Sequence, residues 1–328
     1  MKKVKEYTLA IIGGGPAGIN VAIAAEKAGI DYVILEKGFL VNSIYNFPVN
    51  MTFFSTSKNL EIGDVPFISH TDKPTRHEAL EYYRRIVDAY QLNIQYQEEV
   101  LDLDSRENGY HLKTSKGSYQ ADFVVVATGF YDTPRLLNVP GEDLKKVKHY
   151  YDDVHQYIKQ KVIVIGGANS ACDVALETWQ KGAEVTMVVR DSELYKKTKY
   201  WILPNIQNRI KEGSIKAYFN SQVIEIRENE VDIQTPEGKL TLENDVVLAM
   251  TGYQPNYSFL ESLGLKMDTD EFRTPIHDEE TLESNLAGVY YSGVVSGGLH
   301  TSKYFIENTR DQGDHIIRDI LYKTSVAT

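Results

Sequence analysis

The segment Leu9–Ile19 constrains the fold of this chain more than any other, because it has the pattern of a buried strand, a glycine-rich turn and the start of a helix. Gly13, Gly15 and Gly18 complete the pattern G-x-G-x-x-G, which allows a tight turn, a close approach to a pyrophosphate and packing of the helix on the strand. A helix N-terminus favours negative charge through its free N–H groups and its dipole. The segment therefore predicts a dinucleotide site.

A second apolar strand, residues 32–36, ends in an acidic residue, Glu36. Glu36 follows Gly13 by about 23 positions, the spacing at which this fingerprint places a carboxylate on the ribose diol of a dinucleotide. The alternative is a solvated surface glutamate. The spacing favours the ribose-binding role.

A second strand, glycine turn and helix occupies residues 161–171 in the form G-x-A-x-x-A, with Gly166, Ala168 and Ala171 at the three positions. Arg190 follows Gly166 by about 24 positions, and an arginine there binds the 2′-phosphate of NADP. The alternative is a surface cation. Three lysines follow shortly after Arg190, and they either add to the positive charge at this site or are simply solvated: Lys196, Lys197 and Lys199.

Two similar strand ends divide the chain. The apolar run 121–129 ends in Ala-Thr-Gly, and the run 245–252 ends in Thr-Gly. Because 328 residues are too many for one small core, we expect two domains. The two strand-turn-helix units predict an α/β protein in which both domains are Rossmann-like. We expect the second domain to be inserted into the first, with the chain returning to the first domain at Tyr253. The predicted boundaries are 1–134 with 253–328 for the first domain and 135–252 for the second.

Composition excludes several classes of protein. The net charge of −11 argues against a nucleic-acid binder, which needs a basic surface. No apolar run is long enough for a membrane span and no signal segment is recognised, so we expect a cytoplasmic protein without a membrane partner. The single cysteine, Cys172, excludes an internal disulfide or a Cys-x-x-Cys pair. A helix N-terminus can lower a thiol pKa, but we expect Cys172 to be buried against the sheet.

The remaining segments predict local structure. The aromatic, polar stretch 38–66 has no regular period, so it is a structured loop that carries function or covers a ligand, or one that packs aromatic residues. His300 precedes the last helix and is either structural or catalytic. The other predicted elements are a helix over 75–90, a hairpin over 110–119, a helix starting at Tyr200, four strands between 215 and 242, a strand over 286–294, and a closing helix from Thr301 to about Tyr322.

The glycine turns and strand ends resemble those of the low-molecular-weight thioredoxin-reductase-like flavoproteins, in the pyridine nucleotide-disulfide oxidoreductase superfamily, over essentially the whole chain. Five more specific segments resemble the bacillithiol disulfide reductase branch: Ser43–Pro48, Thr52–Ser55, Leu60–Asp64, Trp201–Pro204 and Phe305–Asn308. The resemblance implies FAD in the first site, NADPH in the second, and a homodimer or higher homo-oligomer. It also implies an enzyme in which NADPH reduces the flavin and the flavin reduces the disulfide of a small thiol.

The predicted contacts follow from the motifs and the resemblance together. For FAD they are Gly13, Gly15, Pro16, Ala17, Gly18, Glu36, Lys37, Asn46, Val100, Thr128, Gly129, Gly293, Val294 and Thr301. For NADPH they are Gly166, Gly167, Ala168, Asn169, Ser170, Ala171, Arg190, Lys197, Thr251 and Gly252. No metal site is predicted.

Two departures from the family pattern leave the catalytic residues unknown. Thioredoxin reductases have a Cys-x-x-Cys in the second domain, and this chain has none. The bacillithiol branch has a cysteine where this chain has Ala17, and a thiolate beside the flavin would open a substrate disulfide. Two alternative functions stay open: a ferredoxin- or flavodoxin-NADP reductase, which needs no cysteine and passes electrons to a small redox protein, and a non-enzymatic NADPH or redox sensor.

Overall fold

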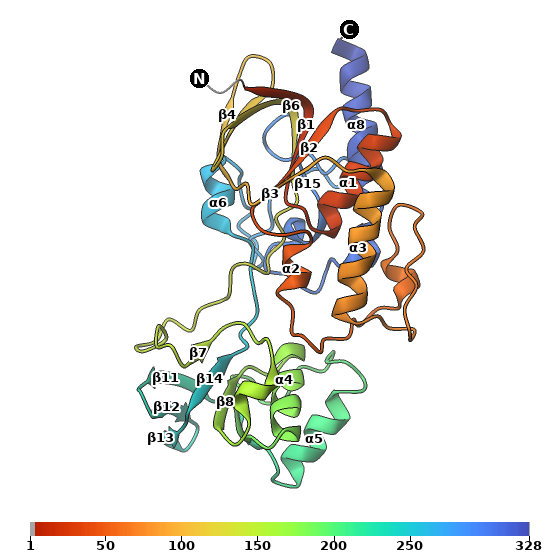
Figure 1. Cartoon of the computed structure of the whole chain (residues 1–328). Helices are drawn as coiled ribbons and strands as arrows, with labels where there is room; N and C mark the ends of the chain where they lie inside the picture. Colours follow the sequence, from red (N-terminus) through yellow and green to blue (C-terminus); the bar gives the residue numbers. More distant parts are fainter. Residues whose placement is uncertain (1–3, 328) are drawn as a thin grey trace. The chain divides into compact units, whose positions relative to one another are not determined.

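The computed structural model describes residues 4–327 and divides them into two compact units (Figure 1). Unit 1 contains the described chain up to Asn46, Met51–Thr133, and the chain from Tyr253 onward. Unit 2 contains Phe47–Asn50 and Pro134–Gly252. The two units therefore alternate along the sequence, and three segments of unit 1 come together from distant parts of the chain.

Unit 1 is built on a seven-stranded sheet whose main path runs β3-β2-β1-β6-β5-β4, with β15 also pairing with β6. The strands β3, β2, β1, β6 and β15 are parallel, whereas β4, β5 and β6 form an antiparallel meander. Strand β1 is buried from Leu9 to Ile12, as expected for a parallel strand covered on both faces. The strands are β1 (Lys5–Ile12), β2 (Tyr32–Glu36), β3 (Ile94–Tyr96), β4 (Val100–Ser105), β5 (Tyr110–Thr114), β6 (Ser118–Val126) and β15 (Val289–Tyr291).

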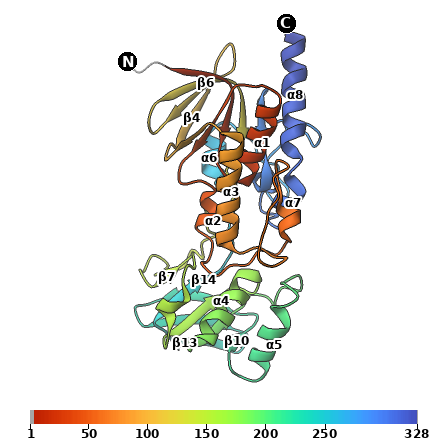
Figure 2. The same cartoon turned by 45° about the vertical axis from the view of Figure 1, so that its right-hand side comes forward.

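Helices α1 and α8 lie side by side in unit 1 (Figures 1 and 2). Helix α3 begins with a capping box, in which the Thr75 hydroxyl accepts from the Glu78 N–H and the Glu78 carboxylate accepts from the Thr75 N–H. This arrangement confirms the predicted helix start at residue 75. The helical elements are α1 (Pro16–Lys27), α2 (Asn42–Tyr45), η1 (Ser57–Leu60), α3 (Arg76–Tyr90), α6 (Tyr257–Ser262), η3 (Gly293–Gly297), α7 (Ile306–Thr309) and α8 (Gln312–Ala327).

Unit 2 contains a five-stranded parallel sheet of order β10-β9-β8-β14-β7 and a separate three-stranded antiparallel sheet of order β11-β12-β13. Both units thus place a parallel strand, a glycine turn and a helix in succession, which confirms the predicted α/β class. The elements are β7 (Val147–Lys148), η2 (Val154–Tyr157), β8 (Lys161–Ile165), α4 (Asn169–Gln180), β9 (Glu184–Val188), α5 (Leu203–Lys211), β10 (Lys216–Tyr218), β11 (Gln222–Ile226), β12 (Glu230–Thr235), β13 (Gly238–Glu243) and β14 (Val246–Ala249).

The predicted closing helix from Thr301 to Tyr322 is wrong at its start. A turn covers residues 301–303, the four-residue helix α7 follows, and α8 begins only at Gln312. Asn308 accepts from the Phe305 N–H at 2.7 Å, and the Thr309 hydroxyl donates to the Phe305 carbonyl at 2.7 Å. These side-chain bonds satisfy the backbone locally and favour a short separate helix.

Three other predicted boundaries are also displaced. Helix α5 begins at Leu203 rather than Tyr200, with Pro204 in its first turn, where the missing N–H costs no helical hydrogen bond. The strand predicted over 286–294 is reduced to β15, because only three of its residues pair with β6. The loop 38–66 contains the short helices α2 and η1, which its irregular period did not indicate.

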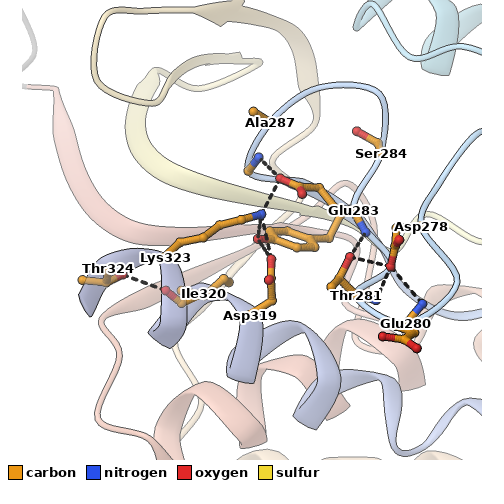
Figure 3. Close-up of polar contacts among 12 residues, drawn as sticks. Asp278, Glu280, Thr281, Glu283, Ser284, Ala287, Asp319, Ile320, Lys323 and Thr324 are labelled. Carbon is orange, nitrogen blue, oxygen red and sulfur yellow. Dashed lines mark hydrogen bonds and ion pairs between the residues drawn. The ribbon is translucent and has the colours of Figure 1, made fainter. Parts of the chain in front are cut away.

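A polar cluster fixes the middle of α8 to β15 and to the loop before β15 (Figure 3). The Lys323 ammonium lies 2.6 Å from Glu283 Oε1 and 2.7 Å from Asp319 Oδ2. The hydroxyl of the fully buried Tyr290 donates to Asp319 Oδ2 at 2.7 Å, and Glu283 Oε1 also accepts from the Gly288 N–H. Burial alone would lower the pKa of Lys323, but the contacts with Asp319 and Glu283 together outweigh burial and raise this pKa above its ordinary value.

Candidate nucleotide-binding sites

The three glycine positions of the first turn require glycine for different structural reasons. Gly13 has φ +113°, and a Cβ added to it would lie 2.6 Å from the Ala127 carbonyl oxygen. A Cβ on Gly18 would collide with the Gly13 carbonyl oxygen. A Cβ on Gly15, by contrast, would meet no protein atom within 4 Å. Gly13 and Gly18 are therefore required by the fold, whereas Gly15 leaves space at the start of α1, where the fingerprint places a pyrophosphate.

Glu36 closes this turn from the end of β2. Its side chain is buried, Oε2 accepts from the Gly14 N–H at 2.6 Å and Oε1 accepts from the Gly38 N–H at 2.6 Å. Burial raises the pKa of Glu36, and the two N–H donors oppose that shift. Each carboxylate oxygen has a second lone pair. Glu36 can thus accept ribose hydroxyls while it holds the turn in shape.

The turn is close to residues from the other end of the chain. Gly293 has φ +80°, and a Cβ added to it would lie 2.5 Å from the Cβ of Ala17. A Cβ on Gly129 would lie 3.9 Å from Val294 Cγ2. The start of α1, the end of β6 and the end of β15 therefore meet at one edge of the sheet. The Oγ of Ser292 is buried there with no hydrogen-bond partner in the described chain. The open space at Gly15 and this unsatisfied hydroxyl fit a large polar cofactor such as FAD.

Gly293 is a predicted FAD contact whose N–H is already bonded within the protein. Its N–H donates to Gln312 Oε1 at 2.6 Å, so this donor is satisfied within the protein. The N–H of Gly313 donates to the buried Asn20 Oδ1 at 3.1 Å. Sequence reasoning missed Gln312 and Asn20, because it placed the last helix eleven residues too early and so assigned no role to its true N-terminus.

The other predicted FAD residues are spread over several elements of unit 1. Lys37 and Asn46 lie in the segment that follows β2, and both contact the segment that follows β6. Lys37 pairs with Asp132 at 2.9 Å, and the Asn46 carbonyl accepts from Tyr131 Oη at 3.1 Å. Thr301 lies in the turn before α7 and not at a helix start. The remaining three are Pro16, the first residue of α1, Val100, buried at the start of β4, and Thr128, just after β6. His300 stacks on Phe272 with ring centroids 4.6 Å apart.

The second glycine turn repeats the geometry of the first. Gly166 has φ +128°, and a Cβ added to it would lie 2.6 Å from the Met250 carbonyl oxygen. Ala168 has extended backbone at the N-cap of α4, and Ala171 is fully buried. The two alanines therefore fit the turn, and the departure from the strict glycine pattern does not change its shape.

The residues around the second turn are arranged by the loop after β9. The Asn169 side chain accepts from the Lys199 N–H at 2.8 Å, and Lys199 pairs with Asp173 at 2.9 Å. The side chain of Arg190 is 85% exposed, and its one ion pair in the described chain is with its neighbour Asp191 at 3.9 Å. The Arg190 guanidinium is thus available to an anionic ligand. The other predicted NADPH residues lie in the turn (Gly167), on α4 (Ser170), in the exposed loop (Lys197) and just after β14 (Thr251 and Gly252).

Cys172 lies on α4 and is fully buried, as predicted. Its Sγ is 3.8 Å from the Gly167 carbonyl oxygen. Burial raises the pKa of the Cys172 thiol to about 12. Cys172 is therefore a structural residue, and unit 1 holds no cysteine.

The fold and the two turns define a class, the two-domain FAD- and NADPH-dependent flavoprotein oxidoreductases. The chain belongs to the pyridine nucleotide-disulphide oxidoreductase family, whose sequence model matches residues 10–293. It is 44% identical to bacilliredoxin reductase Bdr of Bacillus subtilis over 94% of this chain and 96% of that protein.

Two further relatives show how sequence identity differs between the branches of this family. The structure matches bacillithiol disulfide reductase Bdr of Staphylococcus aureus with a TM-score of 0.95 and 42% identity, over 98% of this chain and 99% of that one. A ferredoxin–NADP reductase of Streptococcus pneumoniae is 25% identical over 88% of this chain and 85% of its own length. The resemblance inferred from the sequence motifs is thus confirmed, and the ferredoxin reductases are more distant.

Residues 4–327 lack two further features. None of the helices there combines the length and the apolar character that crossing a membrane requires. No group of three or more histidine, cysteine, aspartate or glutamate side chains is placed to hold a metal ion in that range.

Proposed function

We propose that this enzyme uses NADPH to reduce a disulfide of the bacillithiol type, either the small-molecule disulfide itself or the same disulfide carried on a bacilliredoxin. The observation that supports it is identity above 40% to proteins with these two names over nearly the whole chain. When bound, FAD accepts a hydride from the nicotinamide and passes two electrons to the disulfide. We also infer a cytoplasmic homodimer or higher homo-oligomer.

Unit 1 is the proposed FAD-binding domain. The N-terminus of α1 would hold the pyrophosphate in the space beside Gly15, and Glu36 would accept the ribose hydroxyls. Gly129 and Val294 would pack beside the cofactor where β6 and β15 end. We propose that this domain covers residues 1–134 and 253–328.

Unit 2 is the proposed NADPH-binding domain. The N-terminus of α4 would hold the second pyrophosphate. The exposed guanidinium of Arg190 would bind the 2′-phosphate, with Lys197 adding positive charge. Thr251 would lie beside the nucleotide, as Thr128 would in unit 1.

Ala17 determines how the disulfide is opened. A cysteine there would supply a thiolate for a mixed disulfide, but Ala17 supplies none and Cys172 is buried in the other unit. We expect rapid reduction of the flavin by NADPH and slow turnover of the disulfide. Ala17→Cys is expected to raise disulfide turnover by about tenfold or more, with the flavin-reduction rate unchanged, because a nucleophile splits one difficult step into two.

The experiment measures stopped-flow flavin reduction and disulfide-dependent NADPH oxidation in the parent protein, Ala17→Cys and Cys172→Ser. A fast parent with an inactive Cys172→Ser variant would make Cys172 the catalytic thiol and contradict its structural role. If the parent and Cys172→Ser are equally fast, the reaction needs no protein thiol.

A second candidate function is a reductase of a small redox protein such as ferredoxin or flavodoxin. The observation that favours it is the absence of any cysteine from unit 1, because electron transfer from flavin to such a protein requires none. Rapid NADPH-dependent reduction of a ferredoxin or flavodoxin, together with no turnover of any disulfide by the parent, would select this candidate.

A further inference from the structure

Arg76 is the first residue of α3. Of the charged side chains that are buried in the described chain, it is the one cation. It is 9% exposed, and no carboxylate lies within ion-pair distance of its guanidinium in residues 4–327. Buried charges in proteins are normally paired, since the desolvation cost of an unpaired ion is several kcal/mol. The charge of Arg76 is thus left without a counter-ion.

The hydrogen bonds of Arg76 use only part of its guanidinium. Nε lies 3.2 Å from the Ile44 carbonyl oxygen and 3.1 Å from the Tyr45 carbonyl oxygen, and Nη2 also donates to the Tyr45 carbonyl. These are the last residues of α2, whose carbonyls lack helical partners. Nη1 has no hydrogen-bond partner in the described chain. A neutral donor would satisfy the two carbonyls equally well, so they do not account for the charge.

The surroundings of Arg76 combine this cation with exposed aromatic side chains. The guanidinium carbon lies 5.5 Å from the centroid of the Tyr45 ring, and Phe39 packs edge-on against Tyr45 with centroids 5.2 Å apart. Both rings are about half exposed. Asn46, a proposed FAD contact, follows Tyr45 directly in the chain, so a group bound at Arg76 would lie near the proposed flavin site.

We propose that Arg76, with Tyr45 beside it, binds an anionic group of the electron acceptor, such as a carboxylate. The guanidinium of Arg76 is already fixed by two carbonyls, so it loses little further conformational freedom when a ligand binds. Its remaining N–H groups match a carboxylate or a sulfonate. This inference rests on the proposed function only in assuming an acceptor that is reduced near the flavin. It does not require that the acceptor be a disulfide.

The test uses two quinones that differ in charge, menadione and 1,2-naphthoquinone-4-sulfonate. In each reaction NADPH, a proton and the quinone give NADP⁺ and the hydroquinone, so two electrons are transferred whether or not the protein reduces disulfides. Failure of disulfide turnover would therefore count against the proposed function alone. Arg76→Met is expected to raise the KM of the sulfonate about tenfold, with kcat and the KM of menadione changed less than about twofold.

Arg85→Met is the matched control, because Arg85 lies on the same helix and is exposed and paired with Glu81. It should leave the ratio of the two KM values unchanged. Arg76→Lys keeps the charge but not the planar fork, and is expected to raise the sulfonate KM by about threefold. If Arg76→Met fails to retain FAD, Arg76→Lys decides the result. Unchanged KM ratios in the flavin-bearing variants, or equal losses for both quinones, would overturn the proposal.

Discussion

Gly13, Gly15 and Gly18 constrain the first turn in different ways, in keeping with the separate roles of the three fingerprint glycines. Gly13 and Gly18 have protein atoms where a side chain would begin, whereas Gly15 faces open space. The backbone at Gly15 has φ −79°, a value that any residue adopts. A substitution at Gly15 therefore separates binding of the cofactor from folding of the protein.

We predict that Gly15→Val gives a folded but colourless protein, because the new side chain fills the space proposed for the pyrophosphate. The measurement is the flavin absorbance per protein, together with the circular dichroism spectrum. Gly117→Val is the control, since a Cβ on Gly117 also meets no atom within 4 Å but lies in the β5–β6 turn. Stoichiometric FAD in Gly15→Val would contradict the proposed position of the pyrophosphate.

Arg190 is expected to set the preference for NADPH over NADH. A charge-assisted contact with the 2′-phosphate contributes about 1.5–3 kcal/mol, so Arg190→Glu should weaken NADPH by at least tenfold and NADH much less. The KM of each nucleotide for flavin reduction provides the measurement. Lys211→Glu, an equal charge change on exposed α5, should affect neither nucleotide selectively. Equal losses for the two nucleotides would remove Arg190 from the site.

At the scale of elements, the C-terminal helix α8 links two parts of unit 1. Its first turn contacts the end of β15 and helix α1 through Gln312 and Gly313. Further along the helix, Lys323 pairs with Glu283 and Asp319 (Figure 3). Asp319 also accepts from the hydroxyl of the buried Tyr290. The cluster therefore orients the helix whose N-terminus lies at the proposed FAD site.

We predict that Lys323→Met destabilises the protein by about 1–3 kcal/mol, because Glu283 and Asp319 lose a shared cation in a partly buried position. Urea unfolding with FAD bound gives the free energy of unfolding. Lys216→Met removes an exposed pair with Glu184 and should cost less than about 0.5 kcal/mol. Equal effects of the two substitutions would mean that the cluster does not stabilise α8.

At the scale of the whole molecule, the chain passes from unit 1 to unit 2 and back, and the single cysteine belongs to unit 2. Because Cys172 is fully buried and its thiol pKa is raised to about 12, the thiol should stay protonated at neutral pH. The thiolate is the reactive form, so modification requires opening of unit 2. The rate of Cys172 modification therefore reports the opening of unit 2 alone.

The expected result is slow labelling of native Cys172 by a thiol reagent at pH 7, and further slowing by NADP⁺ but not by added FAD. A ligand that binds only the folded unit lowers the population of its open form in proportion to its concentration over Kd. Because burial raises the pKa of the Cys172 thiol, the thiol of the folded protein stays protonated as the pH rises through 9, where an exposed thiol ionises. Labelling of the folded protein should therefore stay slow over this range. Fast labelling at neutral pH, or protection by FAD alone, would contradict the placement of Cys172.

The sequence alone determined the features that are local in the chain. These features are the strand-turn-helix units at Gly13 and Gly166, the spacing to Glu36 and Arg190, and the helix over 75–90. Each depends on a short segment whose conformation follows from its own residues. The α/β class followed from these units, and the family resemblance followed from the same residues and the branch-specific segments.

Only the tertiary structure decided which distant residues meet. The last helix begins at Gln312 because its first turn packs against α1 and β15, and neither contact leaves a pattern near residue 312. The unpaired charge of Arg76 is likewise invisible in the sequence, where an arginine at the start of an amphipathic helix indicates an exposed side chain. Burial and pairing are sums over neighbours from separate segments, so they appear only when the chain is folded.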